Sequence, residues 1–180
     1  MLERDRPSTI GVREATFAAF VERRLAEQYR LASVILGDAA DAQDATHDAF
    51  ELAWRRWDSL RDPDRLDAWF GRILVNVCRD RLRSRKRRAI RDVSPELAAS
   101  MAAADELQRP ADRDEIGRAF AGLNPDQRVV VVLRFYADLT VDAIAERVGA
   151  PSGTVKSRLH HALQAMAAAL EPSTEGRSRR

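Results

Sequence analysis

Leu139 to Met166, LTVDAIAERVGAPSGTVKSRLHHALQAM, has the pattern of two short helices joined by a tight turn. Thr140 is placed to cap the first helix, because its hydroxyl can accept a hydrogen bond from a first-turn amide. Gly149 predicts the turn, since glycine adopts positive φ without a steric cost. Ser152 is expected to cap the second helix. This order of elements is typical of a helix-turn-helix, which reads DNA with its second helix.

The second helix of this motif has an inner and a free face. Helical spacing predicts an inner face made of Val155, Leu159, Ala162 and Leu163. The free face carries hydroxyl, amine and guanidinium groups, which bind phosphates and base edges. The candidate DNA-binding residues are Ser152, Thr154, Lys156, Ser157, Arg158 and His161. The alternative interpretation is an ordinary corner between two helices of a helical protein.

Length and composition favour an all-α fold. The chain has 180 residues, enough for one large domain or two small ones. The run Val129 to Leu133 is β-branched but continues a helical pattern. No N-terminal apolar segment and no stretch of membrane-spanning length is found. Cys78 is the single cysteine, which excludes an internal disulfide and a cysteine-cluster metal site. We therefore expect a cytoplasmic protein.

Charge is distributed in blocks. Residues 79–91 carry eight basic and one acidic side chain, and residues 127–180 carry eight basic and five acidic ones. Between these blocks, residues 92–126 carry three basic and eight acidic side chains. Two basic blocks separated by an acidic connector indicate two surfaces that face a polyanion.

Three helices are predicted upstream of the connector, over residues 14–36, from Asp38 or Asp41 to about Trp57, and from about Asp64 into the basic block. The second helix has an acidic face formed by Asp41, Asp44, His47 and Asp48. The third has a polar and basic face formed by Asn76, Arg79, Arg83 and Arg87, which suits a nucleic-acid backbone. A solvated helix end is the alternative for this basic face.

The chain divides into two small helical domains joined by a flexible linker. The first domain spans residues 14–91, the linker 92–113 and the second domain 114–170. Within the second domain, Asn124–Pro125–Asp126–Gln127 predicts a capped helix start. That helix is expected to pack inward through Val129, Val130, Leu133 and either Phe135 or Tyr136.

These motifs together resemble the extracytoplasmic-function group of bacterial sigma factors, group 4 of the sigma-70 superfamily. The stretch Leu123 to Leu163, which contains GTVKSRLHHAL, looks like the helix-turn-helix domain known as region four. The stretches Ile35 to Trp54 and Ala68 to Arg88 look like the helical bundle known as region two. Both halves occur in the family's order, which makes the resemblance specific.

The resemblance implies a factor that binds core RNA polymerase and directs promoter-specific initiation. It implies docking on the clamp helices of the largest subunit through Asp41, Asp44, His47 and Asp48, and contact with the polymerase flap. Minus-ten recognition and strand opening would use Arg61, Asn76, Arg79 and Arg83, with a flipped base captured by the loop Asp58 to Asp67. The helix-turn-helix would read the minus-thirty-five element of promoter DNA. An anti-sigma factor is an expected partner, without membrane insertion or cofactor.

The sequence argues against an enzyme. It has no glycine-rich phosphate loop, no metal-spaced histidines and cysteines, and no nucleophile with a recognisable base. Two non-enzymatic alternatives stay open. One is a stand-alone helix-turn-helix transcriptional regulator whose residues 14–91 form a sensory or dimerisation domain. The other is a helical adaptor that binds only proteins.

Overall fold

The computed structural model describes residues 9–92 and 111–171, and all regular elements in this part of the chain are helical. The prediction of an all-α fold is confirmed. The chain separates into two compact units, Met1–Cys78 (unit 1) and Arg79–Arg180 (unit 2). This division falls within helix α3, Leu66–Asp92. Of the predicted linker, residues 93–110 lie outside the described residues.

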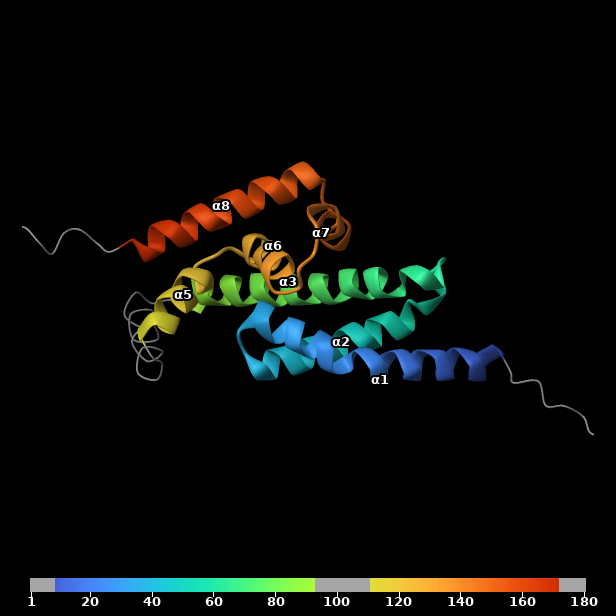
Figure 1. The fold of residues 1–180 in the computed structure, drawn as a ribbon. Coiled ribbons are helices and arrows are strands. Elements are labelled where there is room, and N and C mark those ends of the chain that lie inside the picture. The colour runs from blue at the N-terminus through green and yellow to red at the C-terminus, as the bar shows by residue number, and fades with distance from the viewer. Residues whose placement is uncertain (1–8, 93–110, 172–180) are drawn as a thin grey trace, which may run out of the picture. The chain divides into compact units, whose positions relative to one another are not determined.

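Unit 1 begins with a helical hairpin. Helix α1 spans Thr9–Leu36 and helix α2 spans Ala39–Arg55, and the two run side by side in opposite directions (Figure 1). Gly37 lies between them with a φ of 70°, a conformation that glycine adopts without a Cβ clash. The carboxylate of Asp38 accepts from the amide of Asp41 at 2.7 Å and so caps α2. A two-residue connection therefore fixes this hairpin.

An aromatic core joins α3 to this hairpin. The rings of Phe50 and Phe70 lie 4.4 Å apart, and those of Phe20 and Phe70 lie 5.3 Å apart. Each of the three helices contributes one of these rings, and all three side chains are buried. The connecting segment contains two short 3₁₀ helices, η1 at Trp57–Ser59 and η2 at Pro63–Arg65. Close aromatic packing therefore holds together the two helices that flank this segment.

Helix α6, Pro125–Phe135, contributes an unbroken buried run to the core of unit 2. Helix α5 spans Ala111–Ala121, and the predicted capping box opens α6: Asn124 accepts from the amide of Gln127 at 2.9 Å, and the Gln127 side chain accepts in return at 3.2 Å. All residues from Val129 to Leu133 are buried. The inward packing predicted for Phe135 or Tyr136 is wrong, because both are at least half exposed. Helix α6 ends at Phe135, so both side chains stand at the turn beyond its buried stretch.

The predicted helix-turn-helix is present as α7, Val141–Val148, and α8, Ser152–Leu170. The Thr140 hydroxyl accepts from the amide of Ala143 at 3.2 Å, as the sequence predicts. Gly149 has a φ of 65° and ends α7 in the left-handed conformation. Ile144 and Val155 are fully buried where the two helices pack. Within residues 9–92 and 111–171, none of the helices has the length and apolar character needed to cross a membrane.

The capping box supports a prediction about stability. Asn124→Ala is expected to lower the free energy of unfolding of unit 2 by about 1 kcal/mol, because it leaves a first-turn amide of α6 without its acceptor. Hydrogen exchange of the α6 amides measures this change. Gln164→Ala, at an exposed position of α8, is the control and should stay within about 0.5 kcal/mol of the parent. Equal exchange in the two variants would contradict the prediction.

Candidate nucleic-acid interface

The free face of α8 exposes three of the six predicted DNA-binding residues to solvent. Lys156, Ser157 and His161 are exposed, and Thr154 and Arg158 are half-buried. At Gly153, a Cβ would meet no atom within 4 Å. The first turn of α8 therefore leaves room for a DNA backbone or base edge to approach closely.

The prediction that Ser152 caps α8 is wrong. Pro151 occupies the capping position, with a φ of −59° and a ψ of 147°, and no side chain caps the helix there. Ser152 is consequently the first helical residue, and its hydroxyl donates to the Asp142 carboxylate at 2.6 Å. This bond ties the start of α8 to the first turn of α7. The inward orientation predicted for Leu163 is also wrong, since its side chain is 47% exposed.

Three arginines predicted to bind DNA converge on one carboxylate in unit 2. Arg83 Nη2 donates to Asp126 Oδ2 at 2.9 Å. Arg79 Nη1 lies 3.6 Å from Asp126 Oδ1, and Arg158 Nη1 lies 3.8 Å from the same oxygen. Arg79 also donates to the carbonyl of Val148 at 3.5 Å. The structure thus brings together residues assigned to two different promoter elements, around an acid that the sequence indicated only as a first-turn helix residue.

The remaining residues of the predicted minus-ten set lie in unit 1. Arg61 is exposed between η1 and η2, and Asn76 is half-buried on α3. Asp62 starts η2, accepting from the amide of Asp64 at 3.0 Å, and Pro63 follows as its first residue. The helix start predicted at Asp62–Pro63 therefore takes the form of a 3₁₀ turn that leads into α3.

The acidic face of α2 is a separate surface. Asp44, His47 and Asp48 are exposed, and Asp41 is half-buried in the first turn. Spacings of three and four residues place them along one side of the helix. The next turn adds Glu51, which forms an ion pair with Arg55. This stripe is suited to a basic protein surface and repels a nucleic-acid backbone.

Sequence reasoning missed two arginines of α1. The Arg13 guanidinium lies over the ring of Trp54, 4.6 Å from its centroid. Arg24 forms an ion pair with Asp67 at the start of α3, and the hydrogen bond that Arg24 donates to this carboxylate raises the pKa of Arg24 above its ordinary value. A signal was present in the sequence, because both arginines continue the helical stripe that contains Phe17.

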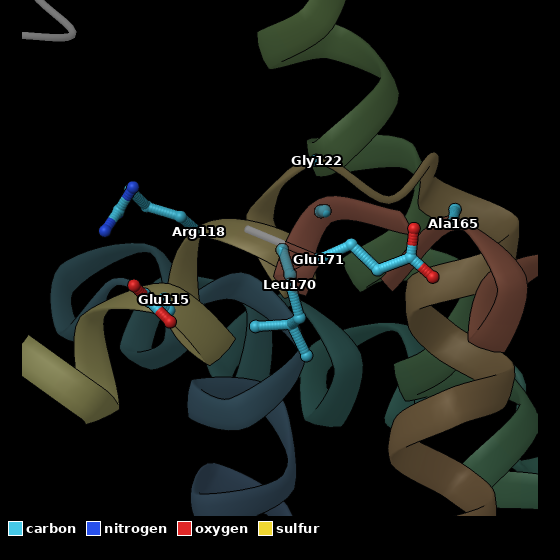
Figure 2. Close-up of a pocket in the computed structure, with 8 residues that line it drawn as sticks. Glu115, Arg118, Gly122, Ala165, Leu170 and Glu171 are labelled. Carbon is cyan, nitrogen blue, oxygen red and sulfur yellow. The ribbon is translucent and has the colours of Figure 1, made fainter. Parts of the chain in front are cut away.

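A hollow of about 690 Å³ opens between α5 and the end of α8. Figure 2 shows Glu115 and Arg118 of α5 near Leu170 and Glu171, which follow one another at the end of α8. None of the predicted site residues lines this hollow. In the described part of the chain, no group of three or more His, Cys, Asp or Glu side chains is arranged to hold a metal ion.

Each half of the chain matches the model of a known protein family. Residues 20–88 match sigma-70 region 2, and residues 113–166 match sigma-70 region 4. The chain is 32% identical over 155 residues to the RNA polymerase sigma-E factor of Streptomyces avermitilis, covering 86% of this chain and 85% of that protein. It is 30% identical over 159 residues to the ECF RNA polymerase sigma factor SigL of Mycobacterium tuberculosis, covering 87% and 90%.

Two solved structures share the fold. The sigma factor RpoE of Bartonella quintana, in complex with the anti-sigma factor NepR, superposes with a TM-score of 0.62 at 22% identity, over 88% of this chain and 98% of that one. CnrH, in complex with the cytosolic domain of CnrY, gives a TM-score of 0.58 at 24% identity, over 86% and 87%. The helical fold of the described residues is therefore also found in solved structures of other proteins.

Proposed function

This chain belongs to the extracytoplasmic-function family of RNA polymerase sigma factors. We propose that different helices of the chain recognise two DNA elements of the promoter. Sigma factors are initiation factors rather than enzymes. They bind core RNA polymerase and direct transcription from specific promoters. What remains to be assigned is which residues of this chain perform each step.

One observation carries the assignment: region 2 and region 4 occur in this order in a single chain. A stand-alone regulator needs a DNA reader and a sensory or dimerisation domain, and an adaptor needs neither promoter-binding part. Neither alternative accounts for the match at residues 20–88. The interpretation as a sigma factor accounts for both matched segments.

The first turns of α8 are proposed to read the minus-thirty-five element. A recognition helix enters the major groove with its N-terminal residues toward the bases. Arg158 is suited to a guanine edge, and Lys156 is suited to a phosphate. The uncapped first turn of α8 adds positive dipole charge where a phosphate would lie. The full set is Ser152, Thr154, Lys156, Ser157, Arg158 and His161.

Minus-ten recognition is assigned to α3 and to the segment before it. The loop Asp58 to Asp67 is proposed to capture one base that has been flipped out of the duplex. Flipping costs a few kcal/mol of lost stacking, which contacts between the base and the loop must restore. The basic face of α3 would hold the displaced strand through its phosphates. The residues assigned to this element are Arg61, Asn76, Arg79 and Arg83.

Docking on the polymerase is assigned to the exposed acidic stripe of α2. Its residues Asp41, Asp44, His47 and Asp48 would face the clamp helices of the largest subunit, and unit 2 would contact the flap. The protein would act in the cytoplasm, where bacterial transcription takes place. The related fold crystallised with the anti-sigma factor NepR supports an anti-sigma factor as a further partner of this chain.

In vitro transcription with core RNA polymerase and a genome-derived template set tests this function. The factor with core enzyme should give promoter-specific transcripts that core enzyme alone does not give. In gel shifts, promoter DNA should be bound and opened only when core enzyme is present. Tight binding of duplex DNA by the factor alone would favour a stand-alone regulator. An absence of specific transcripts on all templates would overturn the proposal.

A further inference from the structure

Helix α1 contacts both ends of the segment that joins α2 to α3. Arg13 reaches the residues where this segment begins, and Arg24 reaches Asp67, where it ends. Arg24 follows Arg13 by eleven residues, or about three turns at 3.6 residues per turn, so both side chains leave α1 on one face. A single rigid helix therefore supports both ends of the loop.

At the first end, Arg13 makes three different contacts. Its Nη2 donates to the backbone carbonyl of Trp54 at 2.9 Å, and its Nη1 donates to Asp58 Oδ1 at 3.1 Å. The guanidinium also lies over the Trp54 ring. Asp58 is 81% exposed, so water weakens its ion pair, and the contacts with Trp54 are the stronger ones. Arg13 thus fixes the last turn of α2 and reaches from there to the loop.

At the second end, Arg24 contacts one acid from each of two helices. It forms an ion pair with Asp67 in the first turn of α3, and its Nη1 donates to Glu27 of α1 at 2.7 Å. The contact with Glu27 holds the guanidinium in place along α1. Asp67 is half exposed, so the pair orients the start of α3 more than it stabilises the fold.

Between the two arginines, Trp57 of η1 is packed from both sides. Its ring meets Phe17 of α1 edge-on at 5.2 Å between centroids, and Trp69 of α3 edge-on at 6.3 Å. Phe17 lies between Arg13 and Arg24 on the same face of α1. Three side chains from one stripe of α1 therefore hold the loop: Arg13 contacts Asp58, Phe17 packs on Trp57, and Arg24 pairs with Asp67.

We propose that Arg13 and Arg24 are positioning residues that hold the loop Asp58 to Asp67 in the shape that accepts a flipped base. Neither residue touches DNA in this role. The inference rests on the proposed function of the loop in minus-ten recognition. A loop ordered in advance does not lose conformational freedom when the base enters, so more of the contact energy appears as affinity. Without the arginines, the loop would be ordered only by the incoming DNA.

The test measures how strongly holoenzyme distinguishes a base from an abasic site. Single-stranded minus-ten oligonucleotides, made abasic at one position at a time, are titrated against polymerase carrying the wild-type factor. One position should show a loss of about five- to 150-fold, the range expected for one stacked base. With Arg13→Ala/Arg24→Ala, the loss at this position should shrink to within about twofold, while affinity for core polymerase stays unchanged. Hydrogen exchange of the loop amides should become faster.

A matched control and a second variant separate the possible outcomes. Arg23→Ala/Arg30→Ala removes the same charge from exposed positions of α1 and should keep the full abasic loss. Asp58→Asn/Asp67→Asn leaves α1 intact and should reduce the loss, which keeps the test decisive if the alanine variant folds poorly. If a folded variant of either kind keeps the full loss and slow loop exchange, the positioning role is overturned. If the wild-type factor shows no loss at any abasic position, the proposed base capture itself fails.

Discussion

Phe70→Ala is expected to lower the free energy of unfolding of unit 1 by about 3 to 5 kcal/mol. Phe70 is 1% exposed, and its ring packs against Phe20 of α1 and Phe50 of α2. Removing it leaves a cavity at a point where α1, α2 and α3 meet through aromatic rings. Domain stability is about 5 to 15 kcal/mol in total, so the loss is a large fraction of it.

Tryptophan fluorescence during denaturant unfolding measures this change directly. All tryptophans of the chain, at positions 54, 57 and 69, lie in unit 1, so the signal reports this unit alone. Phe135→Ala makes the same chemical change at a 63% exposed position of α6 and should leave this transition unmoved. A loss below about 1 kcal/mol in Phe70→Ala would show that the core repacks around the missing ring.

Arg158→Ala should reduce discrimination at one base pair of the minus-thirty-five element by about 1 to 3 kcal/mol, or about five- to 150-fold, while core-polymerase binding stays intact. A bidentate arginine contact with a guanine edge is lost, and alanine offers no replacement donor. In the structure, Arg158 lies 3.8 Å from Asp126, so its guanidinium must leave this carboxylate to reach a base. Transcription from templates substituted one position at a time across the element measures the effect.

Lys156→Ala is the matched comparison for this experiment. Lys156 is exposed on the same helix, and its removal should weaken all templates evenly because a phosphate contact carries no sequence information. If Arg158→Ala also weakens every template by the same factor, Arg158 contacts the backbone and the base assignment is wrong.

Local chemistry made most of the second unit predictable from sequence. The capping box at Asn124, the cap at Thr140 and the left-handed turn at Gly149 each depend on a few neighbouring residues, and all three predictions are confirmed. The cap predicted at Ser152 is wrong because its hydroxyl donates to the Asp142 carboxylate, ten residues away, while the extended backbone of Pro151 precedes the first helical residue. Leu163 was misassigned because periodicity identifies an apolar stripe but not the length over which neighbouring helices cover it.

Contacts between distant residues were beyond sequence reasoning. Asp126 pairs with Arg83, 43 positions earlier, and Arg13 reaches Asp58, 45 positions later. Periodicity places each side chain on a face of its own helix and says nothing of which faces meet. The sequence therefore predicts the arginines of α3 and α8 as cations of two separate DNA surfaces, and it does not predict the carboxylate that they share.

On the proposed assignment of these arginines to DNA, the cluster around Asp126 also changes how DNA binding responds to ionic strength. When Arg79 and Arg83 move to phosphates, as their proposed role in minus-ten recognition requires, they displace condensed cations from the DNA, and each contact steepens the dependence of the binding constant on salt. The abandoned carboxylate then attracts a cation of its own from solution. Net ion release is lower than the number of arginine–phosphate contacts, so a salt titration would underestimate how many arginines bind DNA.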